Sequence, residues 1–368
     1  MADTHPVKPI FTIQQITTQL EGTHTMINRR EFITRGVAAA SALAIPGLLA
    51  VQTARGSRKA AESAANPAPG KSPVIKLNNG VEMPTLGFGT YRAFEATATS
   101  VDTALRAGYR LVDTAAFYGN EEQVGEGIRR SGVQRAELFV TTKLWMADYG
   151  QEQTIRAFDV SLKKLGLDYI DLYLLHYPAP RHFDDTVAAY HAAEKLLAEG
   201  KIRAIGVSNF SAEHLRRLAQ QASTTPAVNQ IEIHPYFIQR ELRAANAALG
   251  IVTQAWSPIG GIFINHPKNG NGIIHLLRDP KIAALAERYG KTTAQIVLRW
   301  HIQNGVATIP KSVQADRIQS NLEVFDFELT PADMVSMDAI DRGLRGGTDP
   351  EIFDMDYMRA RQQAAAKS

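Results

Sequence analysis

The sequence predicts an α/β fold: a closed (β/α)8 barrel of the TIM type, preceded by an N-terminal β-hairpin. Short apolar runs suited to buried strands alternate with amphipathic windows suited to helices, which is typical of parallel βαβ units. Eight such runs over about 240 residues fit a closed barrel better than an open sheet. No Gly-x-Gly-x-x-Gly motif follows the first strand with a helix behind it, which disfavours an open dinucleotide-binding sheet.

The hairpin comes first along the chain. Residues 75–77 and 81–83 flank Asn78-Asn79-Gly80, and Asn-Gly is a strong signal for a tight hairpin turn. The barrel strands are then expected at Leu86–Gly89, Leu111–Asp113, Phe139–Lys143, Ile170–His176, Ile205–Ser208, Val228–Ile233, Val252–Ser257 and Thr308–Lys311. Helices are expected between them, for example at Thr154–Leu165, Val187–Ala198, Ala212–Leu218 and Ala294–Ile302.

The composition is that of a globular protein. Of the 368 residues, 45% are hydrophobic and 21% are charged, so the chain is able to bury a sizeable core. A net charge of +3 without a dense Lys/Arg run argues against nucleic-acid binding. The absence of cysteine excludes disulfides, thiolate metal sites and cysteine nucleophiles. We expect a monomer with no metal site.

Residues 1–53 differ from the rest of the chain and resemble a twin-arginine export signal. Arg29-Arg30 precede an Ala-rich, uncharged run at 36–51, which is too short and too mildly apolar for a transmembrane helix. The alternative is an Ala-rich helix that follows a chance Arg-Arg pair. Because Met26 begins a compact signal of ordinary layout, we expect translation to start there. The expected partner of this region is the export machinery.

The other boundaries follow from composition. Residues 54–73 are rich in Ala, Ser, Pro and Lys/Arg and are expected to form a disordered linker. The barrel is expected at 74–343 and a C-terminal tail at 344–368. We therefore expect a periplasmic or otherwise exported protein, with a cytoplasmic pool and without stable membrane insertion.

Four polar residues stand where predicted strands end or just beyond. Asp113, Lys143 and His176 close three apolar runs, and Tyr118 follows Asp113 in a loop. In such a barrel the carboxyl ends of the strands carry the active site. Taken singly, an Asp–Lys pair is more often a structural salt bridge, and a histidine after an apolar run is more often a core residue. Four such residues at successive strand ends instead indicate catalysis.

The chemistry of these four residues suits protonation of an alkoxide as it forms from a carbonyl. Tyr118 would donate the proton, and a neighbouring Lys143 ammonium is expected to lower the pKa of its phenol. Asp113 would pair with Lys143, and a neutral His176 would orient the carbonyl oxygen. None of them is a hydride source, so a cofactor is required.

Several motifs in the right order, from about Ile75 to Leu329, resemble the aldo-keto reductase family. The motifs are Gly108-Tyr109-Arg110-Leu111-Val112-Asp113-Thr114-Ala115 with Tyr118-Gly119-Asn120-Glu121, Thr142-Lys143-Leu144-Trp145, Leu174-Leu175-His176-Tyr177-Pro178, Gly206-Val207-Ser208-Asn209-Phe210 and Ile309-Pro310-Lys311-Ser312. The resemblance implies a catalytic tetrad of Asp113, Tyr118, Lys143 and His176, with NADPH (NADP) as hydride donor. It is closest in character to the short bacterial branch that includes 2,5-diketo-gluconate and methylglyoxal reductases.

The same resemblance implies where the cofactor lies. Ser208, Asn209 and Gln230 would hold the nicotinamide amide, and Trp256 would stack on the ring. Thr90 would pass beside the cofactor. Ser257 and the Gly/Asn-rich stretch 260–272 would cover the pyrophosphate, either as a mobile lid or as an ordinary surface loop.

A further group indicates NADPH rather than NADH. Lys311, Ser312 and Arg317 stand at a strand end and at the start of the next helix, where two cations and a hydroxyl suit the phosphate monoester of NADP. Asn321 is expected near the adenine. Ser320 replaces a glutamate that the family often has before this asparagine, which is a departure at the adenine contacts.

The substrate mouth is expected to include Tyr91, Phe117, Trp145 and Tyr177, together with parts of the 259–279 loop and of the tail. The substrate would be a small aldehyde, dicarbonyl or keto-sugar. Two alternatives remain at this point. One is a cofactor-binding, non-catalytic regulatory subunit of the same fold, and the other is a metal-dependent hydrolase, for which clustered His/Asp ligands at strand ends are lacking.

Overall fold

A computed structural model describes residues 72–265 and 274–365 of the chain. The described residues belong to one compact unit. The expected signal region, the linker up to residue 71 and residues 266–273 of the expected lid lie outside the described residues. No helix in the described ranges is both long and apolar enough to cross a membrane.

The eight expected barrel strands are all present and all parallel. They are β3 (Phe88–Gly89), β4 (Leu111–Asp113), β5 (Phe139–Leu144), β6 (Ile170–Leu175), β7 (Ile202–Ser208), β8 (Val228–Glu232), β9 (Val252–Trp256) and β10 (Ala307–Thr308). They form one sheet in the order of the chain, β3 to β10. The predicted α/β class is therefore confirmed.

The first and last strands meet and close the barrel. Leu86 forms a parallel bridge with Thr308, and the Gly87 N–H donates to the Thr308 carbonyl at 2.8 Å. Further along, the Gly89 N–H donates to the Pro310 carbonyl at 3.0 Å. A Cβ at Gly89 would lie 2.8 Å from the Ile309 carbonyl oxygen, so only glycine allows this close approach.

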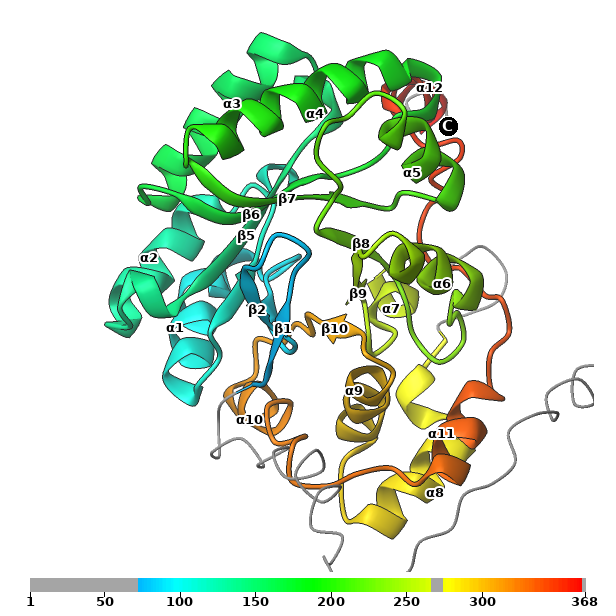
Figure 1. Cartoon of the computed structure of the whole chain (residues 1–368). Helices are drawn as coiled ribbons and strands as arrows, with labels where there is room; N and C mark the ends of the chain where they lie inside the picture. Colours follow the sequence, from blue (N-terminus) through cyan, green and yellow to red (C-terminus); the bar gives the residue numbers. More distant parts are fainter. Residues whose placement is uncertain (1–71, 266–273, 366–368) are drawn as a thin grey trace, which may run out of the picture. The chain divides into compact units, whose positions relative to one another are not determined.

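The predicted hairpin covers the N-terminal end of the barrel. Its strands β1 (Val74–Lys76) and β2 (Glu82–Pro84) pair antiparallel. Asn78 donates to the Pro226 carbonyl, and buried Met83 packs with residues from the starts of several barrel strands. Figure 1 shows the hairpin in front of the barrel strands. The opposite end of the barrel is left for the site.

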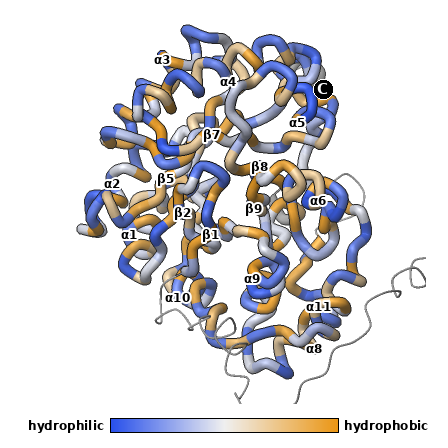
Figure 2. Tube along the Cα trace, viewed as in Figure 1, coloured by the Kyte–Doolittle hydropathy of each residue, from blue (hydrophilic) through white to orange (hydrophobic). Residues whose placement is uncertain are grey.

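Helices surround the barrel, and those that were expected are present with slightly longer bounds. They are α1 (Thr97–Ala107), α2 (Glu121–Ser131), α3 (Gln151–Leu165), α4 (Phe183–Ala198), α5 (Ala212–Ala219), α6 (Arg240–Ala248), α7 (Gly261–Asn265), α8 (Pro280–Tyr289), α9 (Thr293–Gln303), α10 (Ala315–Ser320), α11 (Pro331–Asp338) and α12 (Met355–Ala365). Hydrophobic and hydrophilic residues are interspersed along the helices (Figure 2). Buried apolar residues of the helices pack with those of the strands to form the core.

Candidate active site

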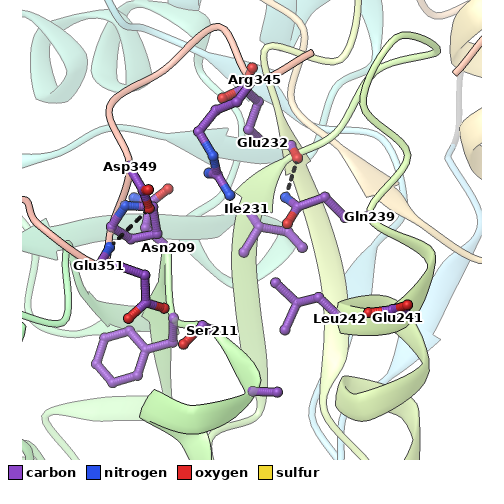
Figure 3. A pocket seen from close by; sticks show the side chains of 13 residues that line it. Asn209, Ser211, Ile231, Glu232, Gln239, Glu241, Leu242, Arg345, Asp349 and Glu351 are labelled. Carbon is purple, nitrogen blue, oxygen red and sulfur yellow. Dashed lines mark hydrogen bonds between the residues drawn. The ribbon is translucent and has the colours of Figure 1, made fainter. Parts of the chain in front are cut away.

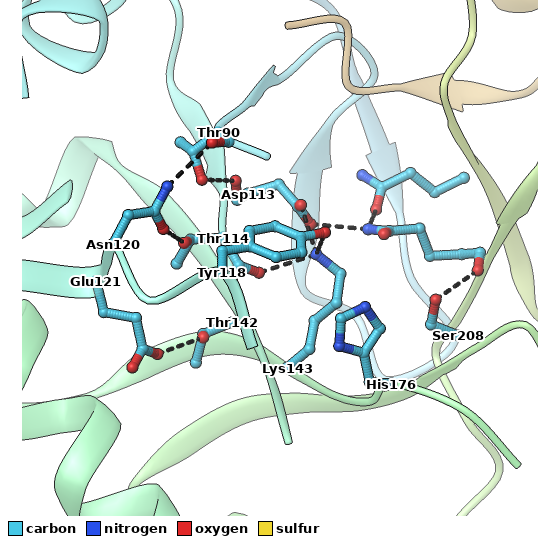
Figure 4. Close-up of polar contacts among 12 residues, drawn as sticks. Thr90, Asp113, Thr114, Tyr118, Asn120, Glu121, Thr142, Lys143, His176 and Ser208 are labelled. Carbon is cyan, nitrogen blue, oxygen red and sulfur yellow. Dashed lines mark hydrogen bonds and ion pairs between the residues drawn. The ribbon is translucent and has the colours of Figure 1, made fainter. Parts of the chain in front are cut away.

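The four polar residues of the sequence prediction meet at the carboxyl end of the barrel (Figure 4). Asp113 is the last residue of β4, Lys143 is the penultimate residue of β5, and His176 directly follows β6. Tyr118 ends the short helix η4 (Ala116–Tyr118), which leaves β4. Three adjacent parallel strands thus supply three of the side chains, and a short loop brings the fourth over them.

Lys143 is the centre of the group. Its ammonium nitrogen lies 2.5 Å from Asp113 Oδ1, 2.8 Å from the Thr114 carbonyl oxygen and 3.3 Å from the Tyr118 hydroxyl. These three contacts match the three protons that an ammonium donates. The side chain is fully buried, and a buried cation is tolerated only where a charge and hydrogen bonds compensate for lost hydration. The site is built around that compensated charge.

The second oxygen of Asp113 is also occupied. Gln230 Nε2, from β8 on the other side of the barrel, donates to Asp113 Oδ2 at 2.8 Å and to Gln254 Oε1 at 2.7 Å. Both amide protons of Gln230 are therefore used within the barrel. Its side-chain oxygen is the atom left to accept a hydrogen bond from a ligand, such as the nicotinamide amide that the family resemblance implies.

The pKa of Tyr118 is raised overall, so the lowering expected from Lys143 is outweighed. Burial, followed by the nearby Asp113 carboxylate, raises the pKa of Tyr118 well above its ordinary value. The Asp113 carboxylate lies 2.5 Å from the Lys143 ammonium and opposes its effect on the phenol, and burial adds to the rise. Burial also raises the pKa of Asp113 and lowers that of Lys143, while their mutual contact opposes both shifts. Tyr118 therefore holds its proton at neutral pH.

His176 has the neutral state that the sequence interpretation assumed. Burial, and then the Lys143 charge, lower its pKa well below the ordinary value. Its Nδ1 atom is buried and has no hydrogen-bond partner among the described residues. The ring lies 5.8 Å from the Tyr118 ring, edge to face. A neutral imidazole beside a protonated phenol can direct a polar oxygen without adding charge.

The residues predicted to hold the nicotinamide are brought together at the ends of β7 and β9. Asn209 has a left-handed backbone (φ 63°), and its Nδ2 donates to the His176 carbonyl at 3.0 Å. Its Oδ1 accepts from the Trp256 indole N–H at 2.9 Å. Ser208 Oγ donates to the Gln230 carbonyl at 2.8 Å. Asn209 thereby ties the predicted stacking platform, Trp256, to the strand that carries His176.

Two more residues of the predicted cofactor path flank the site. Thr90 is buried, and its hydroxyl donates to the Asp113 carbonyl at 3.0 Å. Ser257 follows β9 in a left-handed conformation (φ 51°). A strained backbone of this kind is common where a chain must turn tightly around a ligand.

The residues predicted to bind the phosphate of NADP lie between β10 and α10. Lys311 is partly buried and donates to the Arg92 carbonyl at 3.3 Å, while Arg317 is exposed on α10. Burial, and then the charge of Arg92, lower the pKa of Lys311. Among the described residues no carboxylate lies within ion-pair distance of Lys311 or Arg317. Cations left without an acidic partner fit an anionic group such as a phosphate.

The remaining members of this group play smaller parts in the structure. Ser312 Oγ accepts from the Gln314 N–H at 3.1 Å, and Asn321 is buried after α10. The Ser320 carbonyl accepts from Gln295 Nε2, so its backbone is fastened to α9. Sequence reasoning missed Arg92, whose signal was a cation directly after Tyr91 in the first strand-to-helix loop.

The four aromatic residues predicted at the mouth gather around the catalytic group. Phe117 stacks on Trp145 with ring centroids 4.1 Å apart, and Tyr177 stacks on His176 at 5.5 Å. Tyr91 lies 4.9 Å from Tyr118. These rings form an apolar wall around a polar centre, an arrangement typical of small-molecule sites.

The tail contributes a side chain that sequence reasoning named only as part of a segment. The Phe353 ring lies 4.4 Å from Tyr177 and 6.2 Å from Trp145. Its position could not be deduced from local pattern, because the tail before it contains no strand or helix that aligns it with the barrel. The aromatic wall therefore includes one residue from the far end of the chain.

Glu232, at the end of β8, was also missed. It is buried, and its carboxylate accepts from the Gly346 N–H at 2.6 Å, the Gly347 N–H at 2.8 Å and His234 Nε2 at 2.9 Å. A Cβ at Gly347 would lie 2.6 Å from the Trp256 ring, so the tail packs tightly there. The only hint in the sequence was the Gly346-Gly347 pair.

A cavity of about 240 Å³ lies beside this anchor, between the tail and the ends of β7 and β8. Figure 3 shows Arg345 and Asp349 from the tail above Ile231. Gln239 Nε2 donates a hydrogen bond to the Glu232 carbonyl. Within the described ranges, no group of three His, Asp or Glu side chains is arranged to hold a metal ion.

Comparisons with known proteins agree with this geometry. The Aldo/keto reductase family model matches residues 85–342. Morphine 6-dehydrogenase of Pseudomonas putida is 55% identical over 287 residues, which cover 77% of this chain and 97% of that protein. Glyoxal reductase of Bacillus subtilis (strain 168) is 47% identical over 280 residues, covering 75% of this chain and 96% of that protein.

A solved structure is similar as well. The crystal structure of a Bombyx mori aldo-keto reductase in complex with NADP matches with a TM-score of 0.70 at 37% identity, covering 78% of this chain and 97% of that chain. With the closed barrel, the family model over most of the barrel and relatives this similar, the chain belongs to the aldo/keto reductase family.

Proposed function

We propose that this oxidoreductase uses NADPH to reduce small aldehydes, ketones and dicarbonyls to alcohols, with Tyr118 as the general acid. The observation that carries the proposal is the buried Lys143 ammonium, which joins the Asp113 carboxylate at 2.5 Å to the Tyr118 hydroxyl at 3.3 Å. This arrangement leaves a protonated phenol at the mouth of the barrel beside a neutral imidazole.

The chain's own residues would perform the proton transfer. A substrate carbonyl oxygen accepts hydrogen bonds from the Tyr118 hydroxyl and from the His176 imidazole. As negative charge develops on that oxygen, the phenol proton moves to it, and the Lys143 ammonium stabilises the phenolate that remains. Asp113 keeps Lys143 in place throughout. The proton is then restored from solvent.

The cofactor fits the residues present. The reduced nicotinamide, when bound, supplies the hydride that the carbonyl carbon accepts. Ser208, Asn209 and the free side-chain oxygen of Gln230 would hold its amide group, and Trp256 would offer a flat apolar face. Lys311 and Arg317, which lack acidic partners among the described residues, support a preference for the additional phosphate of NADPH over NADH.

The relatives support a carbonyl or alcohol substrate and differ in its size. Glyoxal reductase is named for a small dicarbonyl, and morphine 6-dehydrogenase for a large polycyclic alcohol. The compact wall of Phe117, Trp145, Tyr177 and Phe353 favours the small class for this chain. Methylglyoxal is therefore the first substrate to test.

The decisive variant is Tyr118→Phe, which removes the phenol proton and keeps the ring. We expect it to reduce kcat with methylglyoxal by about 10³-fold or more, since a general acid contributes about 10²–10⁴-fold. NADPH affinity, measured by fluorescence titration, should stay within about twofold because the ring still fills its place.

Tyr190→Phe is the matched control. Its hydroxyl also donates a hydrogen bond, to the Thr224 carbonyl at 2.9 Å, but from α4 and away from the site. It should leave kcat unchanged. Wild-type protein that binds NADPH tightly yet turns over no member of a carbonyl panel would replace the proposal with the alternative of a regulatory, cofactor-binding subunit.

A further inference from the structure

The tail that carries Phe353 is attached to the barrel by an ion pair between residues far apart in the sequence. Arg181 lies in the short helix η7 (Pro180–His182), five residues after His176. Its Nε and Nη2 atoms donate to the two carboxylate oxygens of Asp354, next to Phe353. This two-point contact fixes both the distance and the orientation of the partners.

The two partners differ in burial, which shows which one depends on the contact. The Asp354 carboxylate is fully buried, whereas 55% of the Arg181 side chain is exposed. Asp354 also accepts from the Tyr357 N–H at 2.9 Å, at the start of α12. A buried carboxylate needs such compensation, and Arg181 supplies the charged part of it.

Two weaker contacts lie on either side of the pair. His182 Nε2 lies 2.8 Å from Asp356 Oδ2, and His214 Nε2 lies 3.4 Å from Glu351 Oε2. Both acidic partners are substantially exposed, and exposed ion pairs contribute little. The Arg181–Asp354 pair is therefore the main polar attachment of this part of the tail, beside the packing of Phe353, Met355 and Met358 on the core.

What the pair positions is the outer wall of the site. Phe353 contacts Tyr177 at 4.4 Å between ring centroids and Trp145 at 6.2 Å. Trp145 in turn lies 5.3 Å from the His176 ring. Aromatic contacts thus run without a break from the tail to the catalytic imidazole. A shift of Asp354 would move Phe353 and widen the mouth.

We propose that Arg181 is a positioning residue that, through Asp354, holds Phe353 against Tyr177 and Trp145 and so makes the enzyme select small carbonyl substrates. The proposal rests on the proposed function for its kinetic consequence. Its structural part, that Arg181 immobilises residues 351–358, is independent of any reaction.

The kinetic test compares Arg181→Ala with wild type on methylglyoxal and on a bulky polycyclic ketone. The KM for methylglyoxal should rise about tenfold, because its apolar wall is lost, while the bulky ketone should gain in kcat/KM. The kcat for methylglyoxal and the NADPH affinity should stay within about twofold, since the tetrad is untouched. Arg181→Lys should restore part of the selectivity.

A double-mutant cycle with Phe353→Ala tests the route of the effect. If Arg181 acts through Phe353, Arg181→Ala should add nothing to the selectivity change that Phe353→Ala already causes. Additive effects of the two substitutions would overturn the proposal. The matched control is Arg216→Ala, because Arg216 makes a similar two-point contact with Glu213 on the exposed surface of α5. Arg216→Ala should leave the kinetic constants for both substrates unchanged.

Hydrogen exchange of the full-length protein separates this proposal from the proposed function. Amides of residues 351–358 should exchange at least about tenfold faster in Arg181→Ala than in wild type, with the barrel strands unchanged. Equal protection in both proteins would refute the positioning role even if carbonyls are reduced. Faster exchange in a protein that reduces no carbonyl would sustain the positioning role and refute the function.

Discussion

The catalytic group and the tail that faces it both depend on a carboxylate paired with a cation, but the two pairs are held in different ways. Asp113 and Lys143 are both buried, and they stand on adjacent strands whose backbone hydrogen bonds fix their places. Asp354 and Arg181 are 173 residues apart, and no ladder of backbone bonds joins their segments. The first pair is placed by the fold, whereas the second places part of the fold.

This difference predicts different consequences when a partner is removed. In the tetrad, the scaffold stays in place around an uncompensated charge, so stability and chemistry both suffer. In the tail, the segment is free to move away and the buried carboxylate regains water. The loss there is one of position and selectivity.

The largest effect is expected for Lys143→Met, which removes the buried cation and keeps most of the volume. Asp113 would remain buried without its charged partner, and the free energy of unfolding should fall by about 3–5 kcal/mol. The kcat with methylglyoxal should fall by about 10²-fold or more, because the phenolate formed at Tyr118 loses its stabilising charge. Urea denaturation and steady-state kinetics measure the two effects.

The double variant Lys143→Met/Asp113→Asn provides the control for this prediction. Removal of both charges should recover much of the lost stability, because no buried ion is left unpaired. It should recover none of the activity. If the double variant is no more stable than Lys143→Met alone, the buried pair does not govern stability in the way described.

The same contrast explains what could be predicted from sequence. Asp113 and His176 were found because each ends an apolar strand, and parallel strands bring their carboxyl ends together whatever the loops do. Arg181 and Asp354 follow no periodic pattern, and nothing near either residue in the chain indicates the other. Contacts that are not imposed by regular structure have no local signature.

The electrostatics of the site were only partly predictable for a related reason. Lys143 was correctly placed beside Tyr118, yet burial and the Asp113 carboxylate raise the pKa of the phenol overall. Sequence identifies neighbours but not how fully one charge is compensated by another or how deeply both are buried. Gln230 is a similar case, because its bond to Asp113 spans the barrel between strands that are not adjacent.

An intermediate effect is expected at the cofactor phosphate, where Lys311 and Arg317 have no acidic partner among the residues that the structure describes. Lys311→Ala should raise the KM for NADPH about ten- to a hundredfold and leave the KM for NADH nearly unchanged, because a charge-assisted hydrogen bond contributes about 1.5–3 kcal/mol. Arg317→Ala should have a smaller effect of the same kind, since Arg317 is exposed. Lys195→Ala, on the outer side of α4 beside Glu199, is the control. An equal loss with both cofactors would rule out the phosphate assignment.

The smallest effect is a pH dependence confined to the tail. The hydrogen bond to Asp356 raises the pKa of His182, with further contributions from Asp354 and Asp185. A group whose pKa is higher in the folded state than in the unfolded state contributes its full stabilisation below the unfolded-state pKa. This stabilisation is lost as pH rises through the folded-state pKa. Burial raises the pKa of Asp354, but the contacts with Arg181 and the Tyr357 N–H more than offset it. The stabilisation from ionised Asp354 is therefore lost only as pH falls into the acid range.

Between about pH 6 and pH 8, therefore, the tail should loosen slightly while the Arg181–Asp354 pair stays intact. Hydrogen-exchange protection of residues 351–358, corrected for intrinsic rates, should fall by less than about twofold, because the His182–Asp356 contact is exposed. His182→Gln should abolish this change. His176 stays neutral and Tyr118 stays protonated across the range, so neither contributes a change in kcat. Protection that falls equally in the variant would assign the effect to another group, with His214 beside Glu351 as the nearest one.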